Sequence, residues 1–248
     1  MKKLALLAAI MTSSFSTLAD SKTEFQTELK AKLTQQGSVQ GMHNLPLRSV
    51  QFVYTDDGNG YAVSGNGRFV FIGQVIDLWQ QKEIKTLADA MNTKRVPLAQ
   101  IGYKKENMAV WNLGNKDIPV QGQIFVSPGC PYCKKLLSFI DENKDDYHFE
   151  IILTPNGTGD PELAQETRRL WCAEDQEVAI NDLIKGTSLA DTERKDCDWK
   201  KVISAGLFFQ AVEGQGVPIM FRADGLRRDG LVNGKSMKEQ LDHFINRS

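Results

Sequence analysis

The chain has 248 residues, and its 30 lysines and arginines nearly balance its 31 aspartates and glutamates, for a formal net charge of −1. Because the two signs are interspersed and no basic stripe is present, the sequence argues against a nucleic-acid-binding protein. A composition of 41% hydrophobic and 25% charged residues excludes a disordered or collagen-like chain.

The N-terminus has the organisation of a secretory signal peptide. Lys2 and Lys3 precede a short apolar run at 4–11, and a stretch of small and polar residues ends at Ala19. The alternatives are a membrane anchor or a core helix, but the run is shorter than the roughly 20 residues that cross a bilayer. We predict a signal peptide over 1–19, export, and no stable membrane insertion after cleavage.

The next part of the chain predicts a helix and then a small sheet. Phe25, Leu29 and Leu33 lie four residues apart, on one face of a helix. Strand-forming runs alternate with Asp, Asn and Gly residues typical of turns. They predict an antiparallel sheet with strands at 50–54, 61–63 and 68–72.

A helical period returns after this sheet. Apolar residues follow the i, i+3, i+4, i+7 spacing from Ile84 to Met91, which predicts a helix over about 80–92. It precedes a second region that begins near Ile118, so we interpret it as a linker helix.

From Ile118 onward strands and helices alternate. The short apolar runs at 122–126 and 149–153 are typical of buried strands, and a helical face lies between them. This order predicts a parallel pair with a crossover helix. Asp160 and Pro161 are typical of a helix start, and helical patterning continues to Gly186. The last predicted elements are a helix at 202–212, strands at 219–221 and 226–231, and a helix capped by Ser236 and Glu239.

The motif Cys130-Pro131-Tyr132-Cys133 holds two of the four cysteines. It follows a predicted buried strand and begins a predicted helix. A helix N-terminus favours a thiolate, the nucleophilic form of cysteine, through its free N–H groups and its dipole. We predict that Cys130 is the nucleophile of a thiol–disulfide oxidoreductase and that Cys133, one turn further on, is the resolving residue.

Zinc binding and an inert disulfide are the alternatives for this pair. A structural zinc site usually has a second close cysteine pair, which the chain lacks, and the histidines at 43, 148 and 243 show no ligand spacing. An inert disulfide across four residues would restrict the unfolded chain very little. We therefore expect neither a metal nor a cofactor.

Two further features leave alternatives open. Cys172 and Cys197 fit a stabilising disulfide around a loop of about 25 residues, worth roughly 3 kcal/mol, or a second redox pair. Val217-Pro218 stands before a short predicted strand. Pro218 is either a cis-proline that leaves the preceding backbone free to pair with a substrate, or an ordinary proline at a strand entry.

Together these features resemble the bacterial DsbC/DsbG family of periplasmic disulfide isomerases, with DsbC the closer over the C-terminal half. The strongest similarity runs from Trp171-Cys172-Ala173-Glu174-Asp175 to Gly216-Val217-Pro218, with weaker similarity at 54–58 and 63–65. The resemblance implies that Cys172–Cys197 is a structural disulfide and that Pro218 is a cis-proline. It also implies an α+β N-terminal dimerisation domain (cystatin-like) at 20–78, a linker helix at 79–100, and an α/β thioredoxin-like domain at 101–248 with a helical insertion at about 160–212.

The resemblance further implies a periplasmic homodimer that isomerises or reduces wrong disulfides in misfolded exported proteins. A membrane thiol reductase of the DsbD type would keep it reduced, and Pro131, Tyr132, Val217 and Pro218 would contact the substrate. Two positions depart from DsbC. Pro131 replaces the usual Gly, as in DsbG, and Val217 replaces the common Thr, as in the oxidase DsbA. A disulfide oxidase of the same fold and a chaperone-like binder therefore stay as alternatives.

Overall fold

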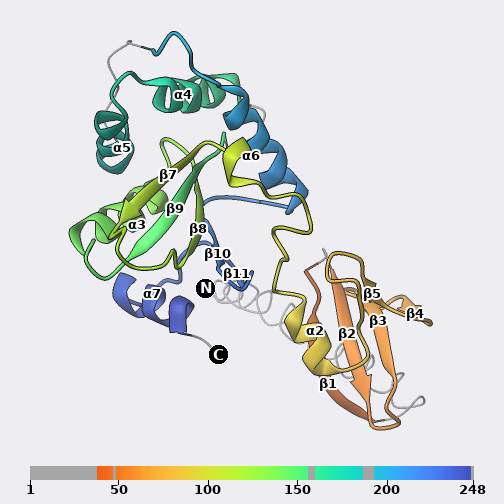
Figure 1. The fold of residues 1–248 in the computed structure, drawn as a ribbon. Coiled ribbons are helices and arrows are strands. Elements are labelled where there is room, and N and C mark those ends of the chain that lie inside the picture. Colours follow the sequence, from red (N-terminus) through yellow and green to blue (C-terminus); the bar gives the residue numbers. More distant parts are fainter. Residues whose placement is uncertain (1–37, 47–48, 156–159, 187–192, 247–248) are drawn as a thin grey trace, which may run out of the picture. The chain divides into compact units, whose positions relative to one another are not determined.

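The computed structural model describes residues 38–46, 49–155, 160–186 and 193–246. The predicted signal peptide and the predicted helix around Leu29 lie outside these residues. The chain divides into two compact units, with the boundary between Lys94 and Arg95 (Figure 1). Among the described helices, none combines the length and the apolar character needed to cross a membrane.

The N-terminal unit is built on a four-stranded antiparallel sheet with the strand order β1-β2-β3-β4. Its strands are β1 (Val39–Asn44), β2 (Val50–Thr55), β3 (Gly60–Ser64) and β4 (Val70–Phe71). A small core forms around Phe52, which packs with Leu45 and Ile84. A Cβ atom on Gly60 would lie 2.2 Å from the Phe52 ring, so the aromatic ring can lie over the strand only where a side chain is missing.

The predicted helix over 80–92 is wrong at its start. Helix α2 covers only Leu87–Asn92, and Lys82–Glu83 forms strand β6, which pairs with β5 (Ile76–Asp77). Thr86 explains the late start, because its hydroxyl accepts the Asp89 N–H while the Asp89 carboxylate accepts the Thr86 N–H in a capping box. The helical spacing of apolar residues therefore begins at Ile84, whereas the helix itself begins only at Leu87.

The C-terminal unit contains a five-stranded sheet with the order β11-β10-β8-β9-β7. Its strands are β7 (Val110–Gly114), β8 (Gly122–Val126), β9 (His148–Leu153), β10 (Ile219–Arg222) and β11 (Arg227–Asp229). Strands β8 and β9 are parallel, as predicted, and helix α3 (Pro131–Glu142) connects them; the other neighbours pair antiparallel. This mixed α/β arrangement is thioredoxin-like.

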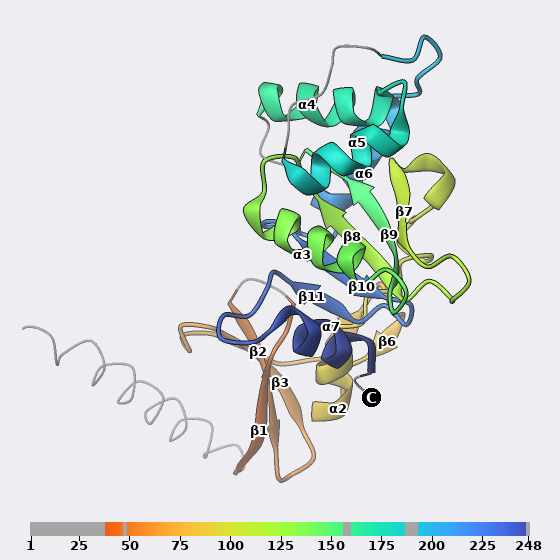
Figure 2. The same ribbon diagram turned by 90° about the vertical axis from the view of Figure 1, so that its left-hand side faces the viewer.

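Buried apolar residues cover both faces of this sheet. Helices α3 and α7 (Met237–Asn246) contribute to the cluster on one face, and α6 (Lys200–Ala211) contributes to the cluster on the other. Helices α4 (Pro161–Cys172) and α5 (Gln176–Lys185) lie between β9 and α6 in the chain, and α5 packs against α3 (Figure 2). The sheet thus holds α3 firmly, with its first turn at the end of β8.

Two elements of this unit differ from expectation. Strand β7 precedes the predicted start of the region at Ile118, and its Trp111 and Leu113 are buried on one face. The helical pattern through to Gly186 is interrupted, because the Asp175 carboxylate accepts the N–H groups of Glu177 and Val178 and begins a new helix.

Candidate active site

The cysteine pair lies where β8 passes into α3. Cys130 is the N-cap residue of α3 and Pro131 occupies its first turn, where a missing N–H group costs nothing. Gly129 precedes the cap with a φ of +71°, a left-handed conformation that glycine adopts without strain. The local sequence therefore turns the chain sharply and presents Cys130 at the helix N-terminus.

The two sulfur atoms have different surroundings. Cys130 is half-buried, whereas Cys133 is 1% exposed and belongs to the core beneath α3. The Cys133 N–H donates to the Cys130 Sγ over 3.1 Å. Both thiols are free in this structure. Only the first sulfur is therefore open to a large disulfide-bonded substrate.

These surroundings move the two pKa values in opposite directions. A hydrogen bond from the Cys133 side chain, helped by the N–H groups of Cys133 and Tyr132, outweighs burial and lowers the pKa of Cys130 to about 6. Burial, followed by the hydrogen bond with Cys130 and the charge on it, raises the pKa of the Cys133 thiol well above its usual range. Near neutral pH the exposed sulfur is thus a thiolate and the buried one keeps its proton.

The loop before β10 completes the site. The Val217–Pro218 peptide is cis, and the Val217 carbonyl oxygen lies 3.5 Å from the Cys130 Sγ. Pairing of Ile219 with Phe125 brings this loop to the end of β8. Tyr132 is exposed within the motif. The contact between Val217 and Cys130 brings the six predicted residues, 130–133 and 217–218, into one place.

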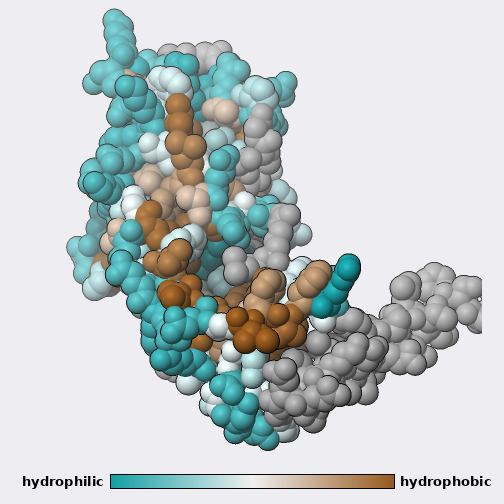
Figure 3. Space-filling view, turned by 90° about the vertical axis from the view of Figure 1, so that its right-hand side faces the viewer, coloured by the Kyte–Doolittle hydropathy of each residue, from teal (hydrophilic) through white to brown (hydrophobic). Residues whose placement is uncertain are grey.

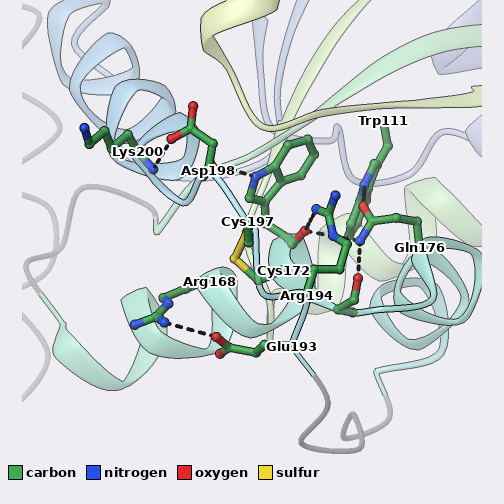
Figure 4. The surroundings of a disulfide bond; sticks show 11 residues. Trp111, Arg168, Cys172, Gln176, Glu193, Arg194, Cys197, Asp198 and Lys200 are labelled. Carbon is green, nitrogen blue, oxygen red and sulfur yellow. Dashed lines mark hydrogen bonds and ion pairs between the residues drawn. A yellow bond between two sulfur atoms is a disulfide. The ribbon is translucent and has the colours of Figure 1, made fainter.

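Cys172 and Cys197 form a disulfide elsewhere in this unit, with their Cα atoms 5.4 Å apart. Figure 4 shows the hydrogen bonds around it. Arg194 donates to the Trp171 carbonyl over 2.8 Å, and the Trp171 indole N–H donates to the Asp198 carbonyl over 3.1 Å. The bond thus joins the end of α4 to the segment before α6 within a hydrogen-bonded loop.

The histidines at 43, 148 and 243 were considered as metal ligands in the sequence. Within the described residues, no group of three or more His, Cys, Asp and Glu side chains is arranged to hold a metal ion. His148 is buried, and its Nδ1 lies 2.7 Å from the Ile118 carbonyl. One ring nitrogen of His148 is therefore hydrogen-bonded to the backbone.

Two buried polar residues at the carboxyl ends of β8 and β9 were not singled out from the sequence. Ser127 follows β8 directly and Thr154 follows β9 directly, and both are buried. Neither hydroxyl has a hydrogen-bond partner in the described chain. The signal in the sequence is a hydroxyl residue immediately after each of two apolar strands, which is too common a pattern to stand out alone.

Comparisons with known proteins point in the same direction as the geometry. No protein-family model matches the chain. The thiol:disulfide interchange protein DsbC of Escherichia coli K12 is 24% identical over 198 residues, which cover 79% of this chain and 78% of that protein. DsbC of Salmonella typhimurium is 22% identical over 247 residues, which cover 98% of this chain and 96% of that protein.

The chain is also similar to a solved structure. A disulfide interchange protein from Neisseria gonorrhoeae is 20% identical, covers 56% of this chain and 96% of its own, and superposes with a TM-score of 0.45. The chain is thus similar in sequence to thiol:disulfide interchange proteins named DsbC, and it has a free cysteine pair at a strand–helix junction.

Proposed function

We propose that this chain is an exported, periplasmic enzyme that isomerises or reduces wrong disulfides in misfolded exported proteins. The observation that carries the proposal is the half-exposed Cys130 sulfur at the N-terminus of α3, with its pKa lowered to about 6. Such a sulfur is a thiolate at neutral pH and can attack a disulfide. A membrane thiol reductase of the DsbD type would return the pair to its reduced state.

In the proposed reaction the Cys130 thiolate attacks one sulfur of a substrate disulfide. A Cys130–substrate disulfide forms, and the other substrate sulfur leaves as a thiolate with the electron pair. In isomerisation a different substrate thiolate then attacks the mixed disulfide and releases Cys130 unchanged. In reduction Cys133 attacks instead, which leaves the Cys130–Cys133 pair oxidised and the substrate with two thiols.

The substrate chain would lie beside the cis peptide. We assign substrate contacts to Val217 and Pro218 from the loop and to Pro131 and Tyr132 from α3. The Val217 carbonyl already reaches Cys130, and a backbone group at this position can hydrogen-bond an extended peptide next to the reacting sulfur. Cys172–Cys197 is proposed as a structural disulfide, separate from the chemistry.

We also propose a homodimer formed through the N-terminal unit, with a dimerisation domain at 20–78, a linker at 79–100 and a catalytic domain at 101–248. The support is an apolar patch on and next to β4, the last strand of its sheet. Phe71 is 55% exposed and Ile72 is 78% exposed, with Phe69 and Val70 also exposed. Figure 3 shows apolar side chains gathered on the surface of this unit, as expected of an interface rather than a free surface.

Refolding of scrambled ribonuclease tests the proposal. The wild-type chain should restore ribonuclease activity in a mildly reducing buffer, and Cys130→Ser should lose this activity completely because the attacking thiolate is gone. A Cys133→Ala variant should accumulate mixed disulfides with exported proteins in cells. If Cys130→Ser refolds ribonuclease as well as the wild type does, the thiol mechanism is refuted. Retention by that variant of anti-aggregation activity alone would favour a chaperone.

A disulfide oxidase is the second candidate, and the low pKa of Cys130 is the observation that favours it. A stabilised thiolate favours the reduced pair and makes the oxidised pair a stronger oxidant. Pro131 and Val217 lie next to the sulfurs and differ from the usual DsbC residues. A monomer whose Cys130–Cys133 pair is fully oxidised in cells would favour the oxidase, whereas a dimer with a reduced pair would favour the isomerase.

A further inference from the structure

Two lysines follow the cysteine pair directly on α3. Lys134 and Lys135 are both exposed, whereas the next two residues, Leu136 and Leu137, are buried in the core. Neither lysine takes part in an ion pair within the part of the chain that the structure describes. Their positive charges therefore act on any molecule that approaches this end of the helix.

The helix places both lysines one turn from residues of the reactive site. The Lys134 N–H donates to the Cys130 carbonyl over 3.0 Å, so these two residues are neighbours on one face of the helix. Lys135 has the same four-residue spacing from Pro131, which we assign to substrate contact. A substrate bonded to the Cys130 sulfur would thus lie about one side-chain length from each ammonium group.

The end of α5 lies against the first of these lysines. A Cβ atom on Gly186, the residue that caps α5, would lie 3.3 Å from the Lys134 Nζ. Lys185 adds a positive charge at this place, but Asp182 lies one turn earlier on the helix. That carboxylate and the negative pole of α5 together offset the added charge. Lys134 and Lys135 are therefore the source of the positive charge beside the site.

The neighbouring segments of the site carry no negative charge to cancel it. Residues 127–129 and 214–218 are uncharged, and the first turn of α3 has no acidic residue. Along α3 the first acid is Asp141, seven positions after Lys134 and so about 10 Å further along the helix. Because the whole chain has a net charge of −1, a positive potential at Cys130 is a local property of this site.

A positive charge here changes which disulfides can approach. Near neutral pH Cys130 is a thiolate, because its pKa is about 6, and its negative charge repels a disulfide that carries carboxylates. Hydrogen bonds from Cys133 and Tyr132 lower this pKa, and no lysine is among its causes. The lysines therefore act on the approaching molecule rather than on the acidity of the sulfur. Charges about 10 Å apart still interact appreciably at low ionic strength.

We propose that Lys134 and Lys135 make Cys130 selective for anionic disulfides, which in a substrate protein are cystines flanked by aspartate or glutamate. This inference rests on the proposed function and adds its substrate class. The two ammonium groups attract the carboxylates during the encounter and hold them while the thiolate attacks. The reaction itself is unchanged: the Cys130–substrate bond forms, and the other substrate sulfur leaves as a thiolate with the electron pair.

Three small disulfides of different charge test the selectivity. The reduced, full-length mature protein reacts at neutral pH and low salt with oxidised glutathione, which is anionic, with cystamine, which is cationic, and with the uncharged hydroxyethyl disulfide. Acid quenching and mass spectrometry give the rate constant for the mixed disulfide at Cys130. Lys134→Gln/Lys135→Gln should react at least about threefold more slowly with glutathione and faster with cystamine. The uncharged disulfide should react within about twofold of the wild-type rate, because the thiolate is intact.

Two control variants separate this effect from a change in net charge or in structure. Lys116→Gln/Lys144→Gln removes the same charge from two exposed lysines at the opposite edge of the sheet, after the ends of β7 and α3. It should keep the wild-type ratio of the glutathione and cystamine rates. Lys134→Arg/Lys135→Arg keeps both charges and should keep that ratio as well. In about 1 M salt, where screening acts within roughly 3 Å, the difference between variants should disappear.

Each other outcome has a definite meaning. If Lys134→Gln/Lys135→Gln reacts with all three disulfides as the wild type does, or slows equally with all three, the selectivity is refuted and the proposed function stands. An equal shift in the Lys116→Gln/Lys144→Gln control would refute the assignment to these two lysines. A wild-type protein that forms no mixed disulfide with any probe overturns the proposed function, and the selectivity with it. Should the double variant not fold, the Lys134→Gln and Lys135→Gln variants are each measured singly.

Discussion

Cys130 couples the chemistry of the site to the stability of the reduced protein. Its pKa falls from an ordinary value of 9.0 to about 6 in the folded state. A depressed pKa stabilises the fold when the group is ionised. This contribution is therefore complete above pH 9, declines as the pH falls, and is absent below about pH 6.

Urea unfolding of the reduced protein measures this contribution. Compared with Cys130→Ser, whose hydroxyl can still cap α3, the wild type should gain unfolding free energy as the pH rises through this window. A difference that stays constant with pH would contradict the prediction. Cys133→Ala should raise the pKa of Cys130, because the Cys133 side chain is the largest cause of its depression. The ultraviolet absorbance of the thiolate reports that pKa.

The position of Cys130 and Cys133 at a strand–helix junction could be predicted from the sequence because the motif lies between an apolar strand and a helix. The contact between Cys130 and Val217 could not be predicted from spacing, since 87 positions separate the two residues. Antiparallel pairing of β10 with β8 creates it, and a strand of four residues carries no signal of its partner. The resemblance to a known family supplied the cis-proline expectation that the spacing left open.

At the scale of elements, the turn into α3 depends on one glycine. Gly129 has a left-handed φ of +71°, and no atom lies within 4 Å of where its Cβ would be. Gly129→Ala should therefore destabilise the protein through backbone strain alone, by ~1–2 kcal/mol. Gly216→Ala is the matched control, because that site is equally open and has no left-handed φ. Denaturant titration of both variants checks the prediction, and equal stabilities would refute it.

Strands β8 and β9 were predictable because both are apolar runs with clear turn or helix signals at their ends. The two-stranded sheet of β5 and β6 could not be predicted. Each strand has only two residues, and Lys and Glu favour helices by intrinsic propensity. Side-chain capping at Thr86 decided where the helix begins, and the apolar period carries no information about such a cap.

At the scale of the whole molecule, the apolar patch around β4 determines the expected assembly. The wild type should sediment as a dimer, and Phe71→Glu should give a monomer, because a charge would lie in the interface. Leu207→Glu is the matched control. Leu207 is 61% exposed on α6 in the other unit, and its variant should stay dimeric. A dimeric Phe71→Glu protein would place the interface elsewhere.

The first residues of the C-terminal unit, Arg95 and Val96, are bound to the turn between β10 and β11. Arg95 pairs with Leu226, and the Val96 N–H donates to the Gly225 carbonyl over 2.8 Å. A Cβ on Gly225 would lie 2.2 Å from the Val96 carbonyl oxygen, so this glycine keeps room for the incoming chain. The C-terminal unit thus holds its own chain from the first residue after Lys94. Replacing the preceding unit at this point should therefore leave the backbone contact between Val96 and Gly225 in place.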